Sequence, residues 1–486
     1  MIPHPPVYTE LLADAEVSRV VEAALRVLAE VGMEIHSEEG LDRLADHGVR
    51  VEHASRRARF SPDFVMNRLE KAPRAWTLQA RNPDRSVEIG RDALVLGPGY
   101  GSAFVGDARG ERRPATLDDL RTFLRLGAAC DVVDLAGGLV VEPCDVEPSL
   151  RPAEVTYALL TESDKPIMGS VDGARGADIA LDMAEIVFGS LDGRLAVLGL
   201  ININSPLRLE ARMADAMIAY LRRGQPLLFT PGILMGVTAP VTPLGALVQA
   251  TAELMACVVL TQVFRPGAAV MVGLGGFGAD LRSAGTGFGR PEQVMATYLG
   301  AQVARRLGLP YRCSPMTTGA FLSDCRAGCE RMMTAMAAWH AGAHLGLQSF
   351  GILDSINTMS LEQFVLDAEY WGYLRHVASG LNADAEALAV EEILALPGDY
   401  MSTDHTIRHF RKTLHLPSLV PAQSYDAWVR QGKRDVASLA AERAAALAAT
   451  TAATPLPPDV CRDLEAYLLA ARRSGNGGLT RGRTSG

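Results

Sequence analysis

The segment Ala268–Gly289, AAVMVGLGGFGADLRSAGTGFG, decides the fold that we expect for this chain. Five small or apolar residues, Ala268–Val272, predict a short buried strand, and a loop with seven glycines follows it. A helix is expected from about Pro291, and this order of strand, glycine-rich loop and helix is typical of sites at the carboxyl end of an α/β sheet. The two charged residues of the loop, Asp280 and Arg282, are either ligand contacts, which we favour, or a surface ion pair.

From about Gly97, apolar stretches of four to seven residues alternate with amphipathic ones. The expected strands are Ala103–Gly106, Leu135–Val141, Pro166–Ser170, Leu195–Ile201, Pro226–Thr230, Ala268–Val272, Tyr311–Ser314 and Leu347–Phe350. The expected helices are Leu117–Ala129, Pro152–Thr161, Ala174–Phe188, Leu207–Arg222, Leu244–Phe264, Pro291–Leu307 and Asp324–Ala343. Continuous apolar strands that alternate with helices predict a parallel sheet. Eight such strands predict an α/β fold of the (β/α)8 TIM-barrel type.

Different patterns flank this repeat, so we expect four regions: an N-terminal helical and small-sheet cap (1–96), the barrel (97–360), a C-terminal helical extension (361–473) and a flexible tail (474–486). Within the cap, apolar spacing and caps predict helices at Val17–Val31, Glu38–His47 and Ser61–Lys71. Trp76–Ala80 and Val87–Ile89 are expected to be short strands.

Composition narrows the class of protein. The chain has 486 residues, 48% of them hydrophobic, and a net charge of −9, so nothing favours binding to nucleic acid or to an anionic membrane. Seven cysteines without regular spacing do not indicate a disulfide framework. The first residues do not resemble a signal peptide. The most apolar helical stretches, Leu254–Val263 and Ile179–Val187, are shorter than the ~20 residues that span a bilayer. We therefore expect a cytoplasmic protein.

Two short motifs have patterns that are typical of cofactor-binding or metal-binding sites. Gly273–Gly278, GLGGFG, fits a dinucleotide-binding pattern, but the following sequence is not the long helix that would receive a pyrophosphate. Cys325, Cys329, His340 and His344 have zinc-like spacing. All four lie on one expected helix, where a rise of ~1.5 Å per residue separates the cysteines from the histidines by about 16 Å. We expect neither a bound nucleotide nor a bound metal.

The expected strand ends carry mostly neutral polar side chains, and barrel enzymes place their functional groups at these ends. Asn202, Asn204, Thr230, Thr238, Thr242, Thr317, Thr318, Gln348 and Asp354 all follow expected strands, where each is either a site residue or a helix cap or turn residue. No nucleophile elbow, P-loop or strand-end lysine accompanies them. Nearby aromatic rings suit a quaternary ammonium, unless they are simply core. This pattern favours binding and positioning over acid–base chemistry.

Longer motifs resemble the trimethylamine:corrinoid methyltransferase family, specifically its members without pyrrolysine. The similarity runs from about Glu30 to Trp428. The matching segments are ERRPAT (111–116), LLTESDKPIMGS (159–170), NSPLR (204–208), GVTAPVTPLGA (236–246), RPGAAVMVG through DLRSAGTGFGRPE (265–292) and DHTIRHFR (404–411). The loop that carries pyrrolysine in typical relatives is expected at Met316–Asp324, and it holds only standard residues here. The segment 339–355 departs from the usual family pattern, so the pocket of this chain is expected to differ.

The resemblance implies methyl transfer from a quaternary amine such as a betaine to the Co(I) corrinoid (cobalamin) of a separate protein that docks over the barrel mouth. We also expect a homo-oligomer. The alternatives are a tertiary amine of the trimethylamine type as substrate, a non-catalytic quaternary-amine binding protein, and a phosphate-gripping barrel lyase or isomerase.

Demethylating a quaternary amine expels a neutral amine and needs no general acid, so the chain itself contributes mainly positioning. We assign catalytic positioning to Asp280, Asn202 and Asn204. Arg282 is assigned to a substrate carboxylate. The remaining substrate-binding assignments are Tyr100, Phe229, Thr238, Phe277, Thr317, Thr318, Gln348 and Phe350.

Overall fold

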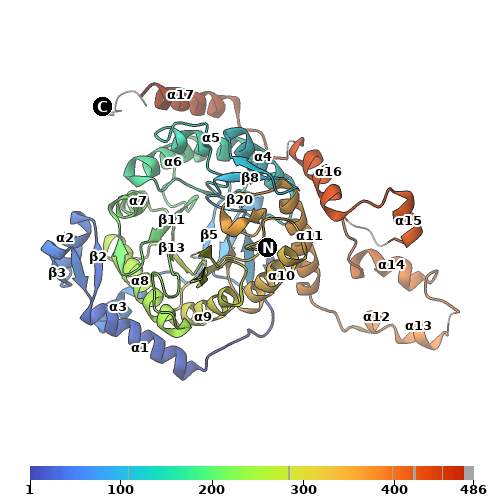
Figure 1. Cartoon of the computed structure of the whole chain (residues 1–486), viewed down its shortest axis with the longest axis horizontal. Helices are drawn as coiled ribbons and strands as arrows, with labels where there is room; N and C mark the ends of the chain where they lie inside the picture. Colours follow the sequence, from blue (N-terminus) through green and yellow to red (C-terminus); the bar gives the residue numbers. More distant parts are fainter. Residues whose placement is uncertain (108, 283–284, 397, 420–422, 451, 475–486) are drawn as a thin grey trace.

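A curled sheet surrounded by helices forms the centre of the protein (Figure 1). The computed structural model describes residues 1–474 except 108, 283–284, 397, 420–422 and 451. The sheet has eight strands, in the spatial order β1 (Ile2–Pro3), β7 (Ala93–Leu96), β18 (Leu345–Gly346), β17 (Tyr311–Cys313), β14 (Val270–Gly273), β13 (Leu227–Pro231), β11 (Val197–Ile203) and β10 (Ile167–Met168). Only the β1–β7 pair is antiparallel.

The segment 134–137 links the two ends of the parallel sheet. The amides of Asp134 and Leu135 both donate to the Leu96 carbonyl of β7, at 2.9 and 3.1 Å. On the other side, the Ala136 amide donates to the Pro166 carbonyl at 2.9 Å, and the Met168 amide of β10 donates to the Gly137 carbonyl at 2.7 Å. The sheet therefore curls far enough that one short segment contacts both β7 and β10.

Helices cover the outside of the sheet (Figure 1). They are α4 (Leu117–Ala129), α5 (Arg151–Glu162), α6 (Gly173–Phe188), α7 (Ala211–Arg222), α8 (Pro243–Phe264), α9 (Pro291–Leu307), α10 (Cys325–His340) and α11 (Leu361–Ala378). Local sequence sets several of their ends. A capping box of Thr116 and Asp119 begins α4, and Gly308, in the left-handed conformation, ends α9.

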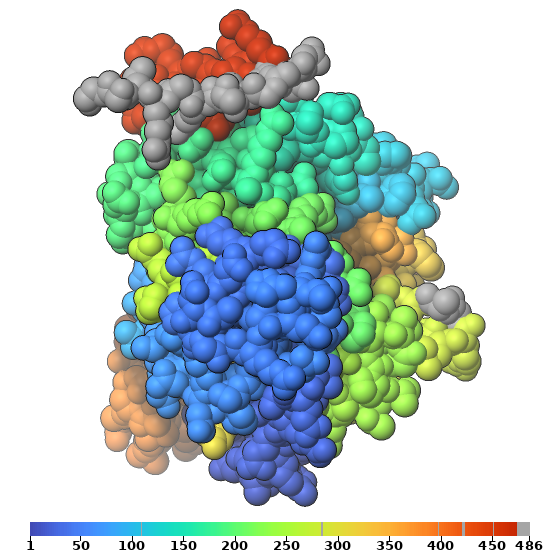
Figure 2. Space-filling view, turned by 90° about the vertical axis from the view of Figure 1, so that its left-hand side faces the viewer, coloured from blue at the N-terminus to red at the C-terminus, as the bar shows by residue number. Residues whose placement is uncertain are grey.

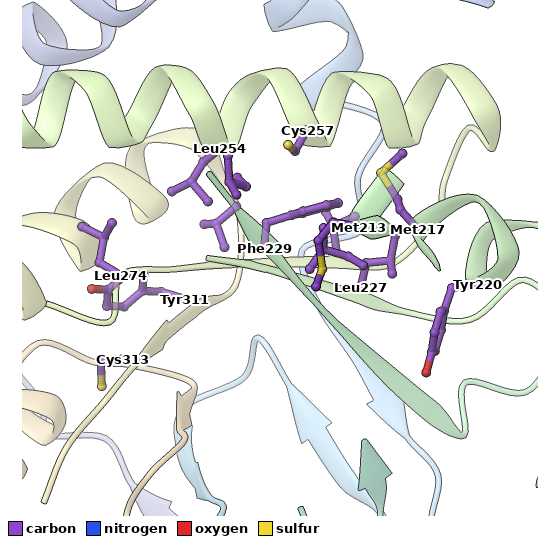
Figure 3. Close-up of a cluster of buried hydrophobic side chains, with 14 of the residues drawn as sticks. Met213, Met217, Tyr220, Leu227, Phe229, Leu254, Cys257, Leu274, Tyr311 and Cys313 are labelled. Atoms are coloured by element: carbon purple, nitrogen blue, oxygen red, sulfur yellow. The ribbon is translucent and has the colours of Figure 1, made fainter. Parts of the chain in front are cut away.

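Side chains alternate between two cores along each strand. Phe229 of β13 packs outward with Met213, Leu254 and Cys257, between the sheet and the helices (Figure 3). Leu228, one residue earlier, belongs instead to a separate inner core. That inner core also contains Val95, Leu198, Leu200, Met271 and Leu345. Thr230, two residues after Leu228, consequently shares its inward direction.

The helices and short strands expected near the N-terminus are present. The N-terminal region contains α1 (Asp14–Glu30), α2 (Glu38–Asp46), α3 (Pro62–Leu69), the short 3-10 helices η1 (His53–Ser55) and η2 (Pro83–Arg85), and a sheet of β2 (Met33–Ile35), β3 (Arg50–Glu52) and β4 (Arg57–Arg59) with β12 (Arg208–Leu209). The hairpin of β5 (Trp76–Leu78) and β6 (Val87–Ile89) joins the inner core. Figure 2 shows the N-terminal residues, in blue, spread over one side of the molecule.

Three of the eight segments expected as strands of the central sheet are not part of its strand order. The first parallel strand is β7, inside the expected cap, whereas Ala103–Gly106 contributes β8 (Phe104–Gly106) to a separate sheet. That sheet also holds β9 (Arg112–Pro114), β19 (Ile352–Leu353) and β20 (Thr358–Met359). Leu347–Phe350 lies just after β18, and Leu135–Val141 forms only isolated bridges. Four residues of β7 between Gly90 and Gly97 are too short a run to stand out in a glycine-rich stretch.

The C-terminal region is helical, as expected. It contains α12 (Ala385–Leu388), α13 (Val390–Leu394), α14 (Asp404–Thr413), α15 (Tyr425–Arg430), α16 (Val436–Ala448) and α17 (Pro458–Ser474). The helix α16 packs against α4 and α11, and α17 packs against α5 and α6. The helices α12–α15 project from the side of the molecule (Figure 1). The expected tail, apart from Ser474, lies outside the described residues.

One helix contradicts the expectation about apolar helix length. At 22 residues, α8 is the one helix of the described chain that is long and apolar enough to cross a membrane. Most of its residues are buried within the protein, where α8 packs against α1, α3 and the sheet. The most apolar stretch, Leu254–Val263, is shorter than the whole helix because Gln249, Thr251 and Glu253 interrupt the apolar run before it.

Candidate functional site

A cavity of about 590 Å³ opens at the carboxyl end of the sheet. It is lined by residues from β11, β13 and β17 and from the loops after β7, β14 and β18. The lining residues are Tyr100, Gly101, Leu200, Asn202, Ile203, Asn204, Ser205, Thr230, Pro231, Gly232, Thr238, Gly275, Phe288, Arg312, Leu347, Gln348 and Ile356. A cavity in this place matches the usual position of active sites in parallel α/β folds.

Five of the expected polar residues meet on the cavity wall: Asn202, Asn204, Thr230, Thr238 and Gln348. Asn202 and Thr230 are register partners in the β11–β13 pair. Thr238 shapes its own loop, because its hydroxyl accepts from the Leu234 amide at 2.8 Å and donates to the Gly232 carbonyl at 2.6 Å. The structure therefore brings residues from separate strand ends together, as their positions predict.

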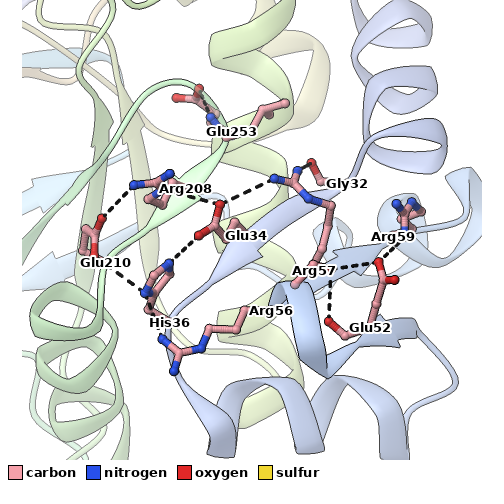
Figure 4. Close-up of polar contacts among 12 residues, drawn as sticks. Gly32, Glu34, His36, Glu52, Arg56, Arg57, Arg59, Arg208, Glu210 and Glu253 are labelled. Atoms are coloured by element: carbon pink, nitrogen blue, oxygen red, sulfur yellow. Dashed lines mark hydrogen bonds and ion pairs between the residues drawn. The ribbon is translucent and has the colours of Figure 1, made fainter.

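Buried Glu253 on α8 anchors the loop that carries Asn204. The Ser205 hydroxyl donates to this carboxylate at 2.6 Å, and the Leu207 amide donates to it at 2.8 Å. Burial raises the pKa of Glu253. On the other side, Arg208 forms an ion pair with Glu34 of the N-terminal region at 3.5 Å (Figure 4). Groups outside the cavity thus fix the position of one of its walls.

The aromatic predictions were mostly wrong. Tyr100 lines the cavity, and burial raises its pKa to about 12, so its phenol is neutral at physiological pH. Phe229, Phe277 and Phe350 are instead fully buried in the outer core, and the Phe350 ring stacks on Phe364 at 5.2 Å. Phe229 is one residue out of register with the inward-facing positions. The second ring on the wall is Phe288, from the same glycine-rich loop.

Asp280 and Arg282 form the surface ion pair that was the less favoured interpretation. The Arg282 side chain is 92% exposed and lies 3.7 Å from Asp280. Arg290 pairs with Asp280 at 2.9 Å, and its hydrogen bond lowers the pKa of that carboxyl to about 2. Neither residue lines the cavity. The loop forms the two-stranded sheet of β15 (Ala279–Asp280) and β16 (Gly285–Thr286), which turns this pair away. Positions 283–284 lie outside the described residues.

Thr317 and Thr318 support the loop after β17 from within. Both are fully buried. The Thr317 hydroxyl accepts from the Gln293 side chain at 2.7 Å, and the Thr318 hydroxyl donates to Glu330 at 2.5 Å. They do not line the cavity, so their contribution is to loop structure. The zinc-like residues are also separate: Cys325 and Cys329 are exposed on α10, whereas buried His344 accepts from the Tyr311 amide at 3.0 Å.

Arg312 is the residue that sequence reasoning missed. It lies in the middle of β17, is only 3% exposed, and contributes its guanidinium to the cavity wall. Its Nη2 donates to the Gln348 side chain at 3.2 Å. Burial lowers the pKa of Arg312 to about 10, which still leaves it charged at neutral pH. The available signal was a charged residue between two apolar ones, Tyr311 and Cys313, in an otherwise buried strand.

Two wall residues have strained backbones. Gln348 and Ile356 have φ values of +68° and +82°, which side-chain-bearing residues rarely adopt. The Ser102 hydroxyl donates to the Ile356 carbonyl at 2.6 Å and so holds the second one in place. Such strain costs about 1–3 kcal/mol per residue and concentrates at functional sites. It supports the assignment of the cavity as the site.

A smaller cavity of about 360 Å³ shares Tyr100 and Asn202 with the first. Its charged residues are paired with each other: Arg151 with Glu142, and Arg212 with Asp172 at 3.2 Å. The larger cavity differs, because none of its described lining residues is Lys, His, Cys, Asp or Glu. Its ionisable side chains are Tyr100 and Arg312, so the wall offers no obvious general acid or base near neutral pH.

Residues 2–478 match the family described as trimethylamine methyltransferase (MTTB). The chain belongs to this family. It is 32% identical over 463 residues to a glycine betaine methyltransferase of Desulfitobacterium hafniense, covering 94% of this chain and 96% of that protein. It is 27% identical to a proline betaine:corrinoid methyltransferase of Eubacterium limosum, covering 86% and 88%. A crystal structure of the Methanosarcina barkeri monomethylamine methyltransferase aligns with a TM-score of 0.48 at 10% identity, covering 97% of this chain and 96% of that one.

Membership in the trimethylamine methyltransferase family agrees with the expectation drawn from the longer motifs. Those motifs surround the site: the segment 204–208 borders the cavity, and the segment 265–292 supplies Gly275 and Phe288 to its wall. The short GLGGFG motif is explained by the same loop, which continues into the hairpin of β15 and β16 rather than into a helix. The glycine-rich segment is thus part of the site, but it contributes Gly275 and Phe288 rather than Asp280 and Arg282.

Proposed function

We propose that this protein transfers a methyl group from a quaternary amine of the betaine type to the Co(I) corrinoid of a partner protein. The cavity supports this proposal because its described lining residues include no side chain suited to act as a general acid or base near neutral pH. A quaternary ammonium leaves as a neutral tertiary amine and takes up no proton. The corrinoid, when the partner protein is docked, supplies the nucleophile. The chain itself binds the amine, orients one methyl group toward the opening and excludes water.

Two aromatic rings are suited to hold the cation. Tyr100 and Phe288 line the same cavity from the loops after β7 and β14. Aromatic faces attract quaternary ammonium groups, and neutral Asn202, Asn204 and Thr230 add dipoles without adding a competing charge. Asn202 and Asn204 are proposed to position the reacting methyl group, because Asn202 lies near the carboxyl end of β11 and Asn204 directly follows this strand.

The fold and the rim support docking of a partner over this opening. We propose that the curled sheet is a closed (β/α)8 barrel with 134–137 as its closing segment and with β7, not Ala103–Gly106, as its first strand. Exposed apolar side chains follow three consecutive strands at the mouth: Val237, Val241, Leu244, Leu281, Phe321 and Leu322. Such a patch beside an open cavity suits a macromolecular partner, here the corrinoid protein.

The expected homo-oligomer and cytoplasmic location remain proposals. The helices α12–α15 contain no buried residue, and Leu394 of α13 is exposed together with Leu396 and Met401 of the linker that follows it, which supports contact with a second copy. Residues 403–434 carry six Lys or Arg and two Asp or Glu, against a net charge of −9 for the chain, so charge complementarity also favours a second copy. The described cysteines are all free, which is consistent with a reducing compartment.

The proposed reaction is tested by mixing the protein with chemically reduced cobalamin and a panel of methylated amines. We expect loss of the Co(I) absorbance with a betaine and release of the demethylated amine, detected by mass spectrometry. Calorimetry on the same panel separates the alternatives. Tight betaine binding without any Co(I) consumption would indicate a binding protein, and reaction with trimethylamine alone would indicate a tertiary-amine enzyme. Binding of inorganic phosphate at the glycine-rich loop would revive the lyase or isomerase.

Replacing Phe288 by leucine is expected to lower kcat/KM for the quaternary amine about 30-fold, because a desolvated cation–π contact is worth about 2 kcal/mol. Leucine preserves apolar bulk but has no aromatic face. Phe288→Tyr keeps the face and is the matched control, for which we expect near wild-type kcat/KM in the cobalamin assay. Equal losses in both variants would show that Phe288 acts by shape alone.

A further inference from the structure

We propose that Arg312, Ser314 and the open space beside Gly275 form a subsite for the carboxylate of a zwitterionic substrate. The inference rests on the proposed function, which concerns the cationic end of the same substrate. It assigns the anionic end to β17, in place of the exposed Arg282.

The first observation is a buried guanidinium without an anionic partner. Within the described part of the chain, no ion pair reaches Arg312, and its Nε has no hydrogen-bond acceptor. Arg331 provides the comparison, because it is equally buried but contacts Asp367 at 2.8 Å. An unpaired buried charge is costly, and proteins normally pair it. Arg312 thus has the environment of a charge whose partner is a ligand.

The second observation is an unpartnered hydroxyl on the same face of the strand. Ser314 lies two residues after Arg312, is 2% exposed, and its Oγ has no hydrogen-bond partner among the described residues. A Cβ placed on Gly275 would lie 3.7 Å from Arg312 Nη1 and 3.8 Å from Ser314 Oγ. The space beside this glycine, which lines the cavity, is therefore where both unpartnered donors come together.

The chemistry of these groups selects a carboxylate. A guanidinium has only donors, in a planar fork that matches the two oxygens of a carboxylate, and the hydroxyl supplies one more. Tyr100 and Phe288 on the same cavity wall are available to the ammonium end. A substrate with a cation and no anion, such as choline, leaves Arg312 unpaired. The site is therefore matched to small betaines with a free carboxylate.

The test measures ligand binding by calorimetry and the melting temperature of the ligand-free protein. The ligands are glycine betaine, its methyl ester and choline, and the variants are Arg312→Met, Ser314→Ala and, as a matched control, Arg282→Met. We expect the wild type to bind glycine betaine at least about 30-fold more tightly than the ester, because truncation of buried charged partners has effects of this size or larger. Arg312→Met abolishes this preference without lowering the melting temperature, Ser314→Ala reduces it about 3- to 10-fold, and Arg282→Met leaves it unchanged.

Three outcomes overturn the subsite: no glycine betaine binding by the wild type, equal affinity for betaine and ester, or an Arg312→Met variant that melts lower and loses all ligands equally. The last would show a structural role. The cobalamin assay is read separately. If carboxylate preference is observed but no quaternary amine consumes Co(I), the subsite stands and the proposed reaction fails. If choline reacts as well as betaine, the reaction stands and the subsite fails.

Discussion

Asp367→Asn is expected to lower the free energy of unfolding by about 3–5 kcal/mol, because it leaves the charge of Arg331 buried without its partner. Both side chains are fully buried, and Arg331 Nη1 contacts the two carboxylate oxygens at 2.9 and 2.8 Å. Burial raises the pKa of Asp367 to about 6, which leaves it ionised at pH 7.5. Chemical denaturation at that pH measures the loss.

This ion pair also holds two loops beside the site. The Gly351 amide donates to Asp367 at 2.7 Å, and Arg331 donates to the Met316 carbonyl at 2.5 Å. The double variant Asp367→Leu/Arg331→Met is the control, since removing both charges of a buried pair is often nearly neutral. We expect it to recover most of the stability. A single variant within about 1 kcal/mol of wild type would contradict the assigned role of the pair.

Lys165→Met is expected to lower the free energy of unfolding by about 3–5 kcal/mol, because three buried carbonyls lose a charged donor. Lys165 is 2% exposed, and its Nζ donates to the carbonyls of Gly127, Cys130 and Val133 at 2.7, 2.8 and 2.6 Å. Burial lowers its pKa to about 8, so it remains mostly protonated at pH 7. These bonds tie the end of α4 and the chain just before 134–137 to the start of β10.

Thermal and urea unfolding of the full chain at pH 7 measure this effect. Exposed Lys71 offers a matched control, and Lys71→Met is expected to change stability by less than about 0.5 kcal/mol. Because the contacts of Lys165 lie where the sheet ends approach each other, its loss is also expected to increase amide exchange at Leu135 and Ala136. A Lys165→Met variant as stable as Lys71→Met would show that the three carbonyls find other donors.

Much of the secondary structure follows from the sequence because the parallel strands are buried on both faces and the helices on one. The runs in Pro226–Thr230 and Ala268–Val272 are recognisable for this reason, whereas the long helix α8 is recognisable as an extended apolar stretch that is mostly buried. The strand β7 was not predicted, because its four residues are followed by glycines and are too few to show a periodic pattern. Ala103–Gly106 has strand composition, but pairing with distant β20 places it in another sheet.

The site was harder to predict because a residue lines the cavity only if its side chain faces the inside of the sheet, as well as lying near a strand end. Phe229 and Thr230 are adjacent, yet one packs against helices and the other lines the cavity. Composition does not show which of two adjacent strand residues faces inward. Once one inward-facing residue such as Leu228 is known, alternation along the strand assigns the others. Arg312 was overlooked because charged residues in a strand are usually at an edge. Arg312 stands out only because it lacks an anionic partner among the described residues, and the sequence alone does not show this.

The two ends of the proposed ligand would contact different kinds of segment, a strand and a loop. Arg312 lies within β17, whereas Phe288 lies in the loop after β14. Insertions or deletions in that loop would shift the ring while the guanidinium stayed in place. The distance between Phe288 and Arg312 would then set the length of the zwitterion that fits. The same fold would thus accept shorter or longer zwitterions without any change to its strands.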